Sequence, residues 1–132
     1  MKVRISASRT YLKNVNRLQK QCGKYNLYFY LFELVGLQLE AGTTAPIANI
    51  GGYTVLKIRG KDPCLSKGKS GGLRVIFAYK DKPMELVYIT VYRKSEKENI
   101  LSHEVERILD EPLQPYNPCD DVIANILEKL SR

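Results

Sequence analysis

Histidine is nearly absent from this sequence, because His103 is the only one among 132 residues. A Ser/His/Asp or Cys/His triad would therefore have to be built around this one side chain. His103 follows Ser102, which the pattern indicates as the N-cap of a helix, and it occupies a polar helix position. We expect an ordinary surface histidine rather than a catalytic one.

Cysteine is also scarce, with Cys22, Cys64 and Cys119 as its only occurrences. Their number is odd, their spacing is wide, and no pair has the C-x-x-C spacing of zinc or redox motifs. The sequence therefore predicts reduced cysteines and a cytoplasmic protein.

Long apolar segments are missing as well. The longest, residues 27–39, is shorter than the roughly 18 residues that indicate a membrane span, and Glu33 interrupts it. The first six residues contain no apolar core of a secretory signal. We expect neither a leader nor a membrane partner.

Cofactor motifs are not found either. Gly68-Lys69-Ser70 lacks the upstream glycine that a Walker A motif requires. The expected strands carry no cluster of acids for two-metal chemistry, and the neighbouring Asp120 and Asp121 are typical of a helix start. We therefore expect no metal and no other cofactor.

Positive charge is abundant, and its distribution is uneven. The net charge is +7, with +7 in residues 1–24, −2 in residues 25–56, +7 in residues 57–97 and −5 in residues 98–132. A basic middle region and an acidic tail suggest a surface that faces a polyanion. A solvated basic face without a partner is the alternative at this point.

Hydrophobic periodicity predicts one α+β unit with helices before and after a set of strands. Ser8 is a candidate N-cap for a first helix that Gly23 ends, and a largely buried second helix over about residues 25–40 pairs with it as an antiparallel hairpin. Period-two segments indicate strands, and polar or glycine-containing stretches over residues 41–52 and 60–71 indicate loops. The strands are expected at residues 2–6, 53–59, 73–80 and 85–92.

The acidic C-terminal part is expected to be helical. A helix capped by Ser102 is stopped by Pro112, residues 112–118 form a proline-rich linker, and a short amphipathic helix begins at Asp120 or Asp121. We predict a domain over residues 1–111, with residues 112–132 belonging to the same compact unit. The last helix completes the core, docks over the basic face or supports self-association, and the pattern leaves these three roles open.

Basic residues gather around the three later strands. Lys57 and Arg59 are two positions apart on a strand and so share a face. Lys67, Lys69 and Arg74 flank Ser70-Gly71-Gly72, where glycines let the backbone approach a phosphate. The last strand ends in Tyr92, Arg93 and Lys94, with Lys97 nearby. Cations with interleaved tyrosines suit RNA, through phosphate contacts and stacking, although we assign Tyr79 and Tyr88 to the core more readily than Tyr92.

Three segments in this order resemble the RelE/HigB branch of the RelE/ParE toxin superfamily. They are Leu56-Lys57-Ile58-Arg59, the stretch from Lys67 to Phe77 (KGKSGGLRVIF) and the stretch from Ile89 to Glu98 (ITVYRKSEKE), and the resemblance covers about residues 1–110. It implies a small twisted antiparallel sheet with an N-terminal helical hairpin on one face and C-terminal helices. It also implies the toxin of a type II toxin–antitoxin pair, with a cognate antitoxin as its partner.

The resemblance implies a metal-independent mRNA interferase that cuts mRNA on the ribosome. The ribose 2′-OH attacks the adjacent phosphate, which leaves a 2′,3′-cyclic phosphate and a 5′-OH. The chemistry is carried over to Arg74 for charge stabilisation, to Lys57 and Arg59 for phosphate binding and proton transfer, and to Tyr92 and Lys94 at the strand end. The flanking residues expected to bind RNA are Lys61, Lys67, Lys69, Ser70, Arg93 and Lys97.

The general base is the role that the residues define least. Lys57 lies among other cations, and neighbouring positive charge disfavours its protonated form, so it is our candidate base. Arg74 does not titrate usefully and would act electrostatically. Some family members have a tyrosine a few residues after the last strand, where this sequence has Asn99-Ile100-Leu101.

Two other functions fit the same expected fold. A ParE-like toxin would bind DNA gyrase and would need no dense set of cations. A non-catalytic member would bind RNA or a protein partner without cutting, and the missing tyrosine favours it. Growth arrest without RNA cleavage would indicate the first, and ribosome binding without arrest would indicate the second.

Overall fold

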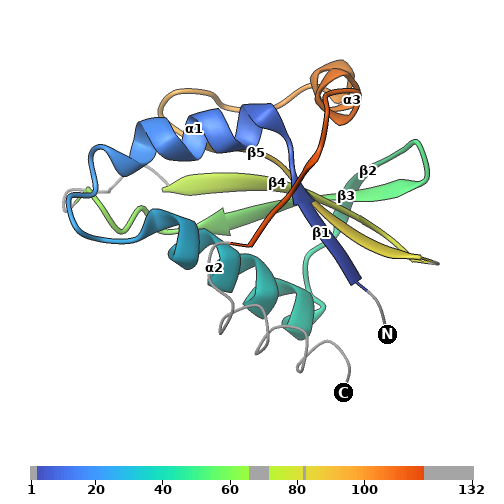
Figure 1. The fold of residues 1–132 in the computed structure, drawn as a ribbon, viewed down its shortest axis with the longest axis horizontal. Helices are drawn as coiled ribbons and strands as arrows, with labels where there is room; N and C mark the ends of the chain where they lie inside the picture. Colours follow the sequence, from blue (N-terminus) through green and yellow to red (C-terminus); the bar gives the residue numbers. More distant parts are fainter. Residues whose placement is uncertain (1–2, 66–71, 82, 118–132) are drawn as a thin grey trace.

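The computed structural model describes residues 3–65, 72–81 and 83–117. In this part the chain forms an α+β structure with three helices and a six-stranded sheet (Figure 1). The elements in chain order are β1 (Val3–Ala7), α1 (Arg9–Gln19), α2 (Leu27–Ala41), β2 (Pro46–Ile50), β3 (Tyr53–Gly60), β4 (Leu73–Lys80), β5 (Met84–Arg93), α3 (Ser102–Leu109) and β6 (Gln114–Pro115).

The sheet has the strand order β2-β3-β4-β5-β1-β6, and it is mixed. All neighbouring strands are antiparallel except β1 and β5, which run parallel. The expectation of an antiparallel sheet is therefore wrong at this one pair. Alternating residues identify a strand but not its partner, and a parallel neighbour requires a long crossover, here residues 8–83.

The two N-terminal helices form as the sequence predicts. The Ser8 side chain accepts a hydrogen bond from the Tyr11 backbone N–H (2.9 Å), which satisfies one free donor of the first turn of α1. Asn26 caps α2 in the same way through the Phe29 N–H (3.1 Å), and α2 ends at Gly42, whose φ of 65° is left-handed. Figure 1 shows the two helices running in opposite directions from their connecting turn.

Two hydrophobic cores lie on opposite faces of the sheet. On one face, which we call the α1/α2 face, both N-terminal helices pack against the strands through residues such as Leu18, Leu31 and Phe77. On the other, the α3 face, Val105 and Ile108 pack against alternate strand residues such as Ile76. The expected placement of the helical hairpin on one face is confirmed.

An aromatic cluster occupies the centre of the α1/α2 face. The Tyr88 ring lies 5.1 Å from the rings of Tyr11 and Tyr116 and 5.7 Å from that of Phe32, measured between centroids. The expectation of a core role is thus confirmed for Tyr88. Tyr79 is half-buried and packs against the same core.

Three local predictions differ from the structure. Residues 46–50, expected within a loop, form the edge strand β2; its exposure and its first-position proline hide the strand pattern. Leu101 rather than Ser102 is the N-cap of α3, and the Glu104 carboxylate accepts the Leu101 backbone N–H (3.3 Å). Within the expected linker, Gln114–Pro115 pairs with β1 and the next residue, Tyr116, is buried. The expected final helix lies outside the described residues.

The pairing of the cysteines also differs from the prediction. Cys22 and Cys64 are joined by a disulfide, with a Cα–Cα distance of 4.7 Å, so the expectation of reduced cysteines is wrong for this pair. They are 42 residues apart, and only the tertiary fold brings the turn after α1 to the loop after β3. Disulfides are typical of oxidising compartments, which removes the argument from cysteine usage for a cytoplasmic location. Cys119 lies outside the described residues.

None of the three described helices is long and apolar enough to cross a membrane.

Candidate nucleic-acid interface

A row of cationic and aromatic residues crosses three strands on the α3 face. Arg59 of β3 lies opposite Arg74 of β4, and Arg74 lies opposite Tyr92 of β5. Directly opposed residues of antiparallel strands point to the same face, as do residues two apart on one strand, which adds Lys57. Tyr92 packs in the α3-face core and so identifies that face. We call Lys57, Arg59, Arg74 and Tyr92 the cationic row.

Arg74 and Tyr92 form the buried part of the row. Arg74 is 8% exposed, and its guanidinium donates to the Leu73 carbonyl oxygen (3.1 Å). Burial raises the pKa of the Tyr92 hydroxyl; the Arg74 charge opposes this shift, and the Glu104 carboxylate adds to it. The hydroxyl is therefore neutral at physiological pH. It has no hydrogen-bond partner among the described residues.

Lys57 and Arg59 form the accessible part of the row. Arg59 is exposed and Lys57 is half-buried. The Lys57 ammonium donates a hydrogen bond to the Asn99 side-chain oxygen (3.2 Å). Lys57 and Asn99 line a cavity of about 180 Å³ between β2, β3 and the start of α3. The remaining walls are formed by Ile47, Ala48, Ile100, Ser102 and Val105.

The other predicted RNA-binding residues are placed differently. Lys94 and Lys61 are exposed, and the Lys94 backbone N–H donates to the Gly72 oxygen (3.0 Å). The Lys97 ammonium forms an ion pair with Glu104. Arg93 alternates to the opposite side of β5 and pairs with Asp62 (2.8 Å). Lys67, Lys69 and Ser70 lie outside the described residues.

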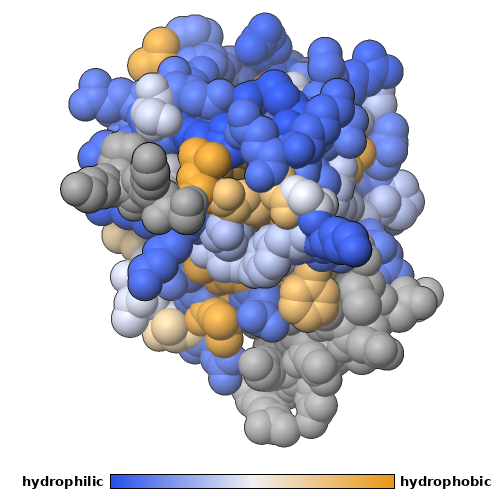
Figure 2. Space-filling view, turned by 90° about the vertical axis from the view of Figure 1, so that its left-hand side faces the viewer, coloured by the Kyte–Doolittle hydropathy of each residue, from blue (hydrophilic) through white to orange (hydrophobic). Residues whose placement is uncertain are grey.

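The positive charge of residues 1–24 belongs to another surface. The exposed cations Arg9, Lys13, Arg17 and Lys20 lie on or next to α1, which packs on the α1/α2 face. Figure 2 shows predominantly hydrophilic side chains on the upper part of the molecule's end, over α1. The positive charge of residues 1–24 therefore does not add to the cationic row, which is formed within residues 57–97.

Three acidic or amide residues that contact predicted site residues were not identified from the sequence. Asn99 accepts the hydrogen bond of Lys57. Glu104 forms an ion pair with Lys97 and raises the pKa of Tyr92. Asp62 forms an ion pair with Arg93. The resemblance expects a tyrosine close to position 99, and this was the only sequence signal that could have indicated Asn99 as a site residue. Asp62 lies 31 residues from Arg93, so no local pattern connects them.

A second cavity, of about 280 Å³, lies on the α1/α2 face. Its mainly apolar wall includes Leu39, Leu56 and Leu86, and no residue of the cationic row lines it. Within the described ranges no three His, Cys, Asp or Glu side chains are close enough to hold a metal ion together. His103 is exposed on α3, as expected.

The cationic row has the chemistry of a polyanion site. Arg59 and Lys57 offer charge and hydrogen-bond donors at the surface, and the buried Arg74 adds a positive charge on the neighbouring strand. The neutral Tyr92 hydroxyl is a donor and not a base. Such an arrangement suits the negatively charged oxygens of a phosphodiester backbone.

The fold and this row define an α+β protein with a candidate phosphate-binding surface. A scan against protein-family models gives no match, and a search of curated proteins gives no significant match.

Proposed function

We propose that the protein is a RelE/HigB-type endoribonuclease, the toxin of a type II toxin–antitoxin pair that acts on mRNA at the ribosome. The cross-strand row of Lys57, Arg59, Arg74 and Tyr92 is the observation that carries this proposal. The helical hairpin on the opposite face supports it, because it does not cover Lys57 and Arg59, the accessible part of the row. The proposal places the protein in the cytoplasm, with an antitoxin as its protein partner.

The proposed reaction uses only groups of the chain and the RNA. Lys57, as its neutral amine, takes the proton of the ribose 2′-OH, whose oxygen attacks the neighbouring phosphorus. Arg74 and Arg59 stabilise the charge on the phosphoryl oxygens. The bond from phosphorus to the 5′ oxygen breaks, and the exposed Lys94 ammonium donates a proton to that oxygen. The products are a 2′,3′-cyclic phosphate and a 5′-OH.

A second candidate is a non-catalytic RNA-binding protein of the same fold. The burial of Arg74 and of the Tyr92 hydroxyl favours it, because these groups offer little surface to a substrate. Under this alternative Lys57 and Arg59 still bind phosphate, and only the cleavage step is missing.

Salt-dependent binding to a single-stranded RNA tests the part that both candidates share. Each lost phosphate contact reduces the slope of log K against log salt by about 0.7. Lys57→Ala and Arg59→Ala should each produce this change, while Lys13→Ala on α1 should not. Unchanged slopes in both row variants would contradict the proposed site.

The reaction products separate the two candidates. Ribosomes programmed with a defined mRNA should yield fragments with a 2′,3′-cyclic phosphate end if the protein is a nuclease. Binding without such fragments would indicate the non-catalytic candidate. Absence of both binding and fragments would contradict both.

A further inference from the structure

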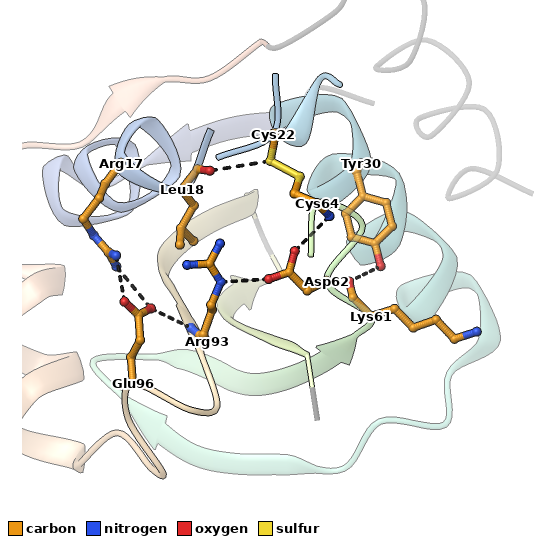
Figure 3. Close-up of polar contacts among 9 residues, drawn as sticks. All are labelled: Arg17, Leu18, Cys22, Tyr30, Lys61, Asp62, Cys64, Arg93 and Glu96. Atoms are coloured by element: carbon orange, nitrogen blue, oxygen red, sulfur yellow. Dashed lines mark hydrogen bonds and ion pairs between the residues drawn. A yellow bond between two sulfur atoms is a disulfide. The ribbon is translucent and has the colours of Figure 1, made fainter. Parts of the chain in front are cut away.

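The loop that follows β3 is fixed to the rest of the molecule at three points. The Tyr30 hydroxyl of α2 donates to the Lys61 carbonyl oxygen (2.7 Å). The Arg93 Nε of β5 donates to Asp62 Oδ2 (2.8 Å). The Cys64 sulfur is bonded to that of Cys22 in the turn after α1. Figure 3 shows that these anchors come from three different parts of the fold. Residues 61–65 are called the anchored loop below.

Asp62 couples the disulfide to the end of β5. Its Oδ1 accepts the Cys64 backbone N–H (3.0 Å), while its Oδ2 binds Arg93. The Asp62 and Arg93 side chains are 4% and 10% exposed, so this ion pair is shielded from solvent. Arg93 stands between Tyr92 and Lys94, two residues of the proposed site. The position of the anchored loop and that of the β5 end are thus fixed together.

The disulfide joins two residues that pack at the edge of the core without being fully buried. Cys22 and Cys64 are both partly exposed. Disulfides are exchanged by thiolate attack on one sulfur, and such attack requires access. A buried structural disulfide would lack this access.

We propose that Cys22 and Cys64 form a reversible thiol–disulfide site whose redox state sets the order of the anchored loop and, through it, the affinity of the cationic row for RNA. The second part rests on the proposed function. The reductant is a dithiol, which is either a small molecule such as dithiothreitol or a protein with two thiols.

The thiol–disulfide exchange needs no reactant other than the dithiol. One thiolate of the dithiol attacks a cysteine sulfur, so a mixed disulfide forms and the other cysteine leaves as a thiolate that takes a proton. The second thiol of the reductant, as its thiolate, then attacks the mixed disulfide. The reductant departs as a disulfide, two electrons pass to the protein, and Cys22 and Cys64 both become thiols.

Reduction removes the only covalent anchor of the loop. The contacts of Lys61 and Asp62 remain, and Cys64 keeps its N–H bond to Asp62 and its packing against the core, but it loses its covalent bond to the turn after α1. Under the proposal, RNA binding orders again each residue that gains backbone freedom. The lost affinity is about tenfold for each such residue.

Hydrogen exchange of the anchored loop tests the redox site itself. The full chain is compared before and after treatment with dithiothreitol, and the Cys64 amide is expected to exchange about tenfold faster or more in the reduced chain. A Cys119→Ser variant should behave like the wild type, and a Cys22→Ser/Cys64→Ser variant should resemble the reduced chain without responding to reductant. Equal exchange rates in oxidised and reduced wild type would overturn the proposal.

RNA affinity in the same two states separates this inference from the proposed function. We expect a fluorescent single-stranded RNA to bind about tenfold more weakly to the reduced chain. Equal affinity in both states, with faster loop exchange, would overturn the regulatory part and leave the proposed function standing. No RNA binding in either state, with faster loop exchange, would overturn the proposed function and support the redox site.

Discussion

The buried ion pair between Asp62 and Arg93 gives the strongest prediction about stability. Its two side chains are 4% and 10% exposed, and the Nε–Oδ2 distance is 2.8 Å. Asp62→Ala would leave the Arg93 guanidinium buried without its partner, which costs about 3–5 kcal/mol. The Cys64 N–H would also lose its acceptor, which adds about 1 kcal/mol.

An exposed ion pair of the same protein is the matched control. Arg17 and Glu96 are 2.8 Å apart with side chains 50% and 37% exposed. Such surface pairs contribute about 0–1 kcal/mol, so Arg17→Ala should change the free energy of unfolding by no more than that. The contrast between the two variants follows from burial, since their distances are equal.

Urea denaturation of the oxidised chain measures the free energy of unfolding of both variants. The midpoint should fall strongly for Asp62→Ala and hardly for Arg17→Ala, at unchanged m-values. Replacing both partners, as Asp62→Ala/Arg93→Met, should recover part of the loss, because no unpaired charge is then buried. A loss below about 1 kcal/mol for Asp62→Ala would refute the reasoning, since that is the range of exposed pairs.

Three further predictions concern stability. Gly72→Ala should destabilise by about 1–2 kcal/mol or more in urea denaturation, because Gly72 has a φ of +64° and a Cβ there would lie 2.1 Å from the Gly60 oxygen. The hydrogen bond from Arg17 lowers the pKa of Glu96, so its contribution is present at neutral pH and is lost as the pH falls below about 4. Glu96→Gln should flatten that part of a stability–pH curve, and an unchanged curve would contradict this. Ser8→Ala should lower the unfolding free energy by about 1–2 kcal/mol, because the buried cap of α1 is lost.

Local sequence patterns predict most elements of this fold, because helix periodicity, caps and strand alternation are short-range properties. Ser8 caps the first helix as predicted, although the helix ends at Gln19, before the expected Gly23, and the period-two segment of β4 has the predicted bounds. The parallel pairing of β1 with β5 depends on a contact about 80 residues away in sequence, so no local pattern contains it. The exposed β2 has too few apolar residues to be recognised as a strand.

The candidate site could be predicted only as far as strand geometry determines it. Lys57 and Arg59 share a face because they are two residues apart, and this needs no knowledge of neighbouring strands. The alignment of Arg59 with Arg74 depends on the register between β3 and β4. The partners Asn99 of Lys57 and Asp62 of Arg93 come from distant loops, and so does the Cys22–Cys64 bond.

Mapping of new 5′ ends on translated mRNAs tests the central claim most directly. The wild type, Arg74→Ala and the exposed α1 control Arg9→Ala would be induced in a bacterial host, with folding of each checked by circular dichroism. The account predicts in-frame cuts with the wild type and with Arg9→Ala, and none with a folded Arg74→Ala. Growth arrest without cuts would indicate gyrase or another target. The same cuts with Arg74→Ala as with the wild type would contradict the assignment of the cationic row.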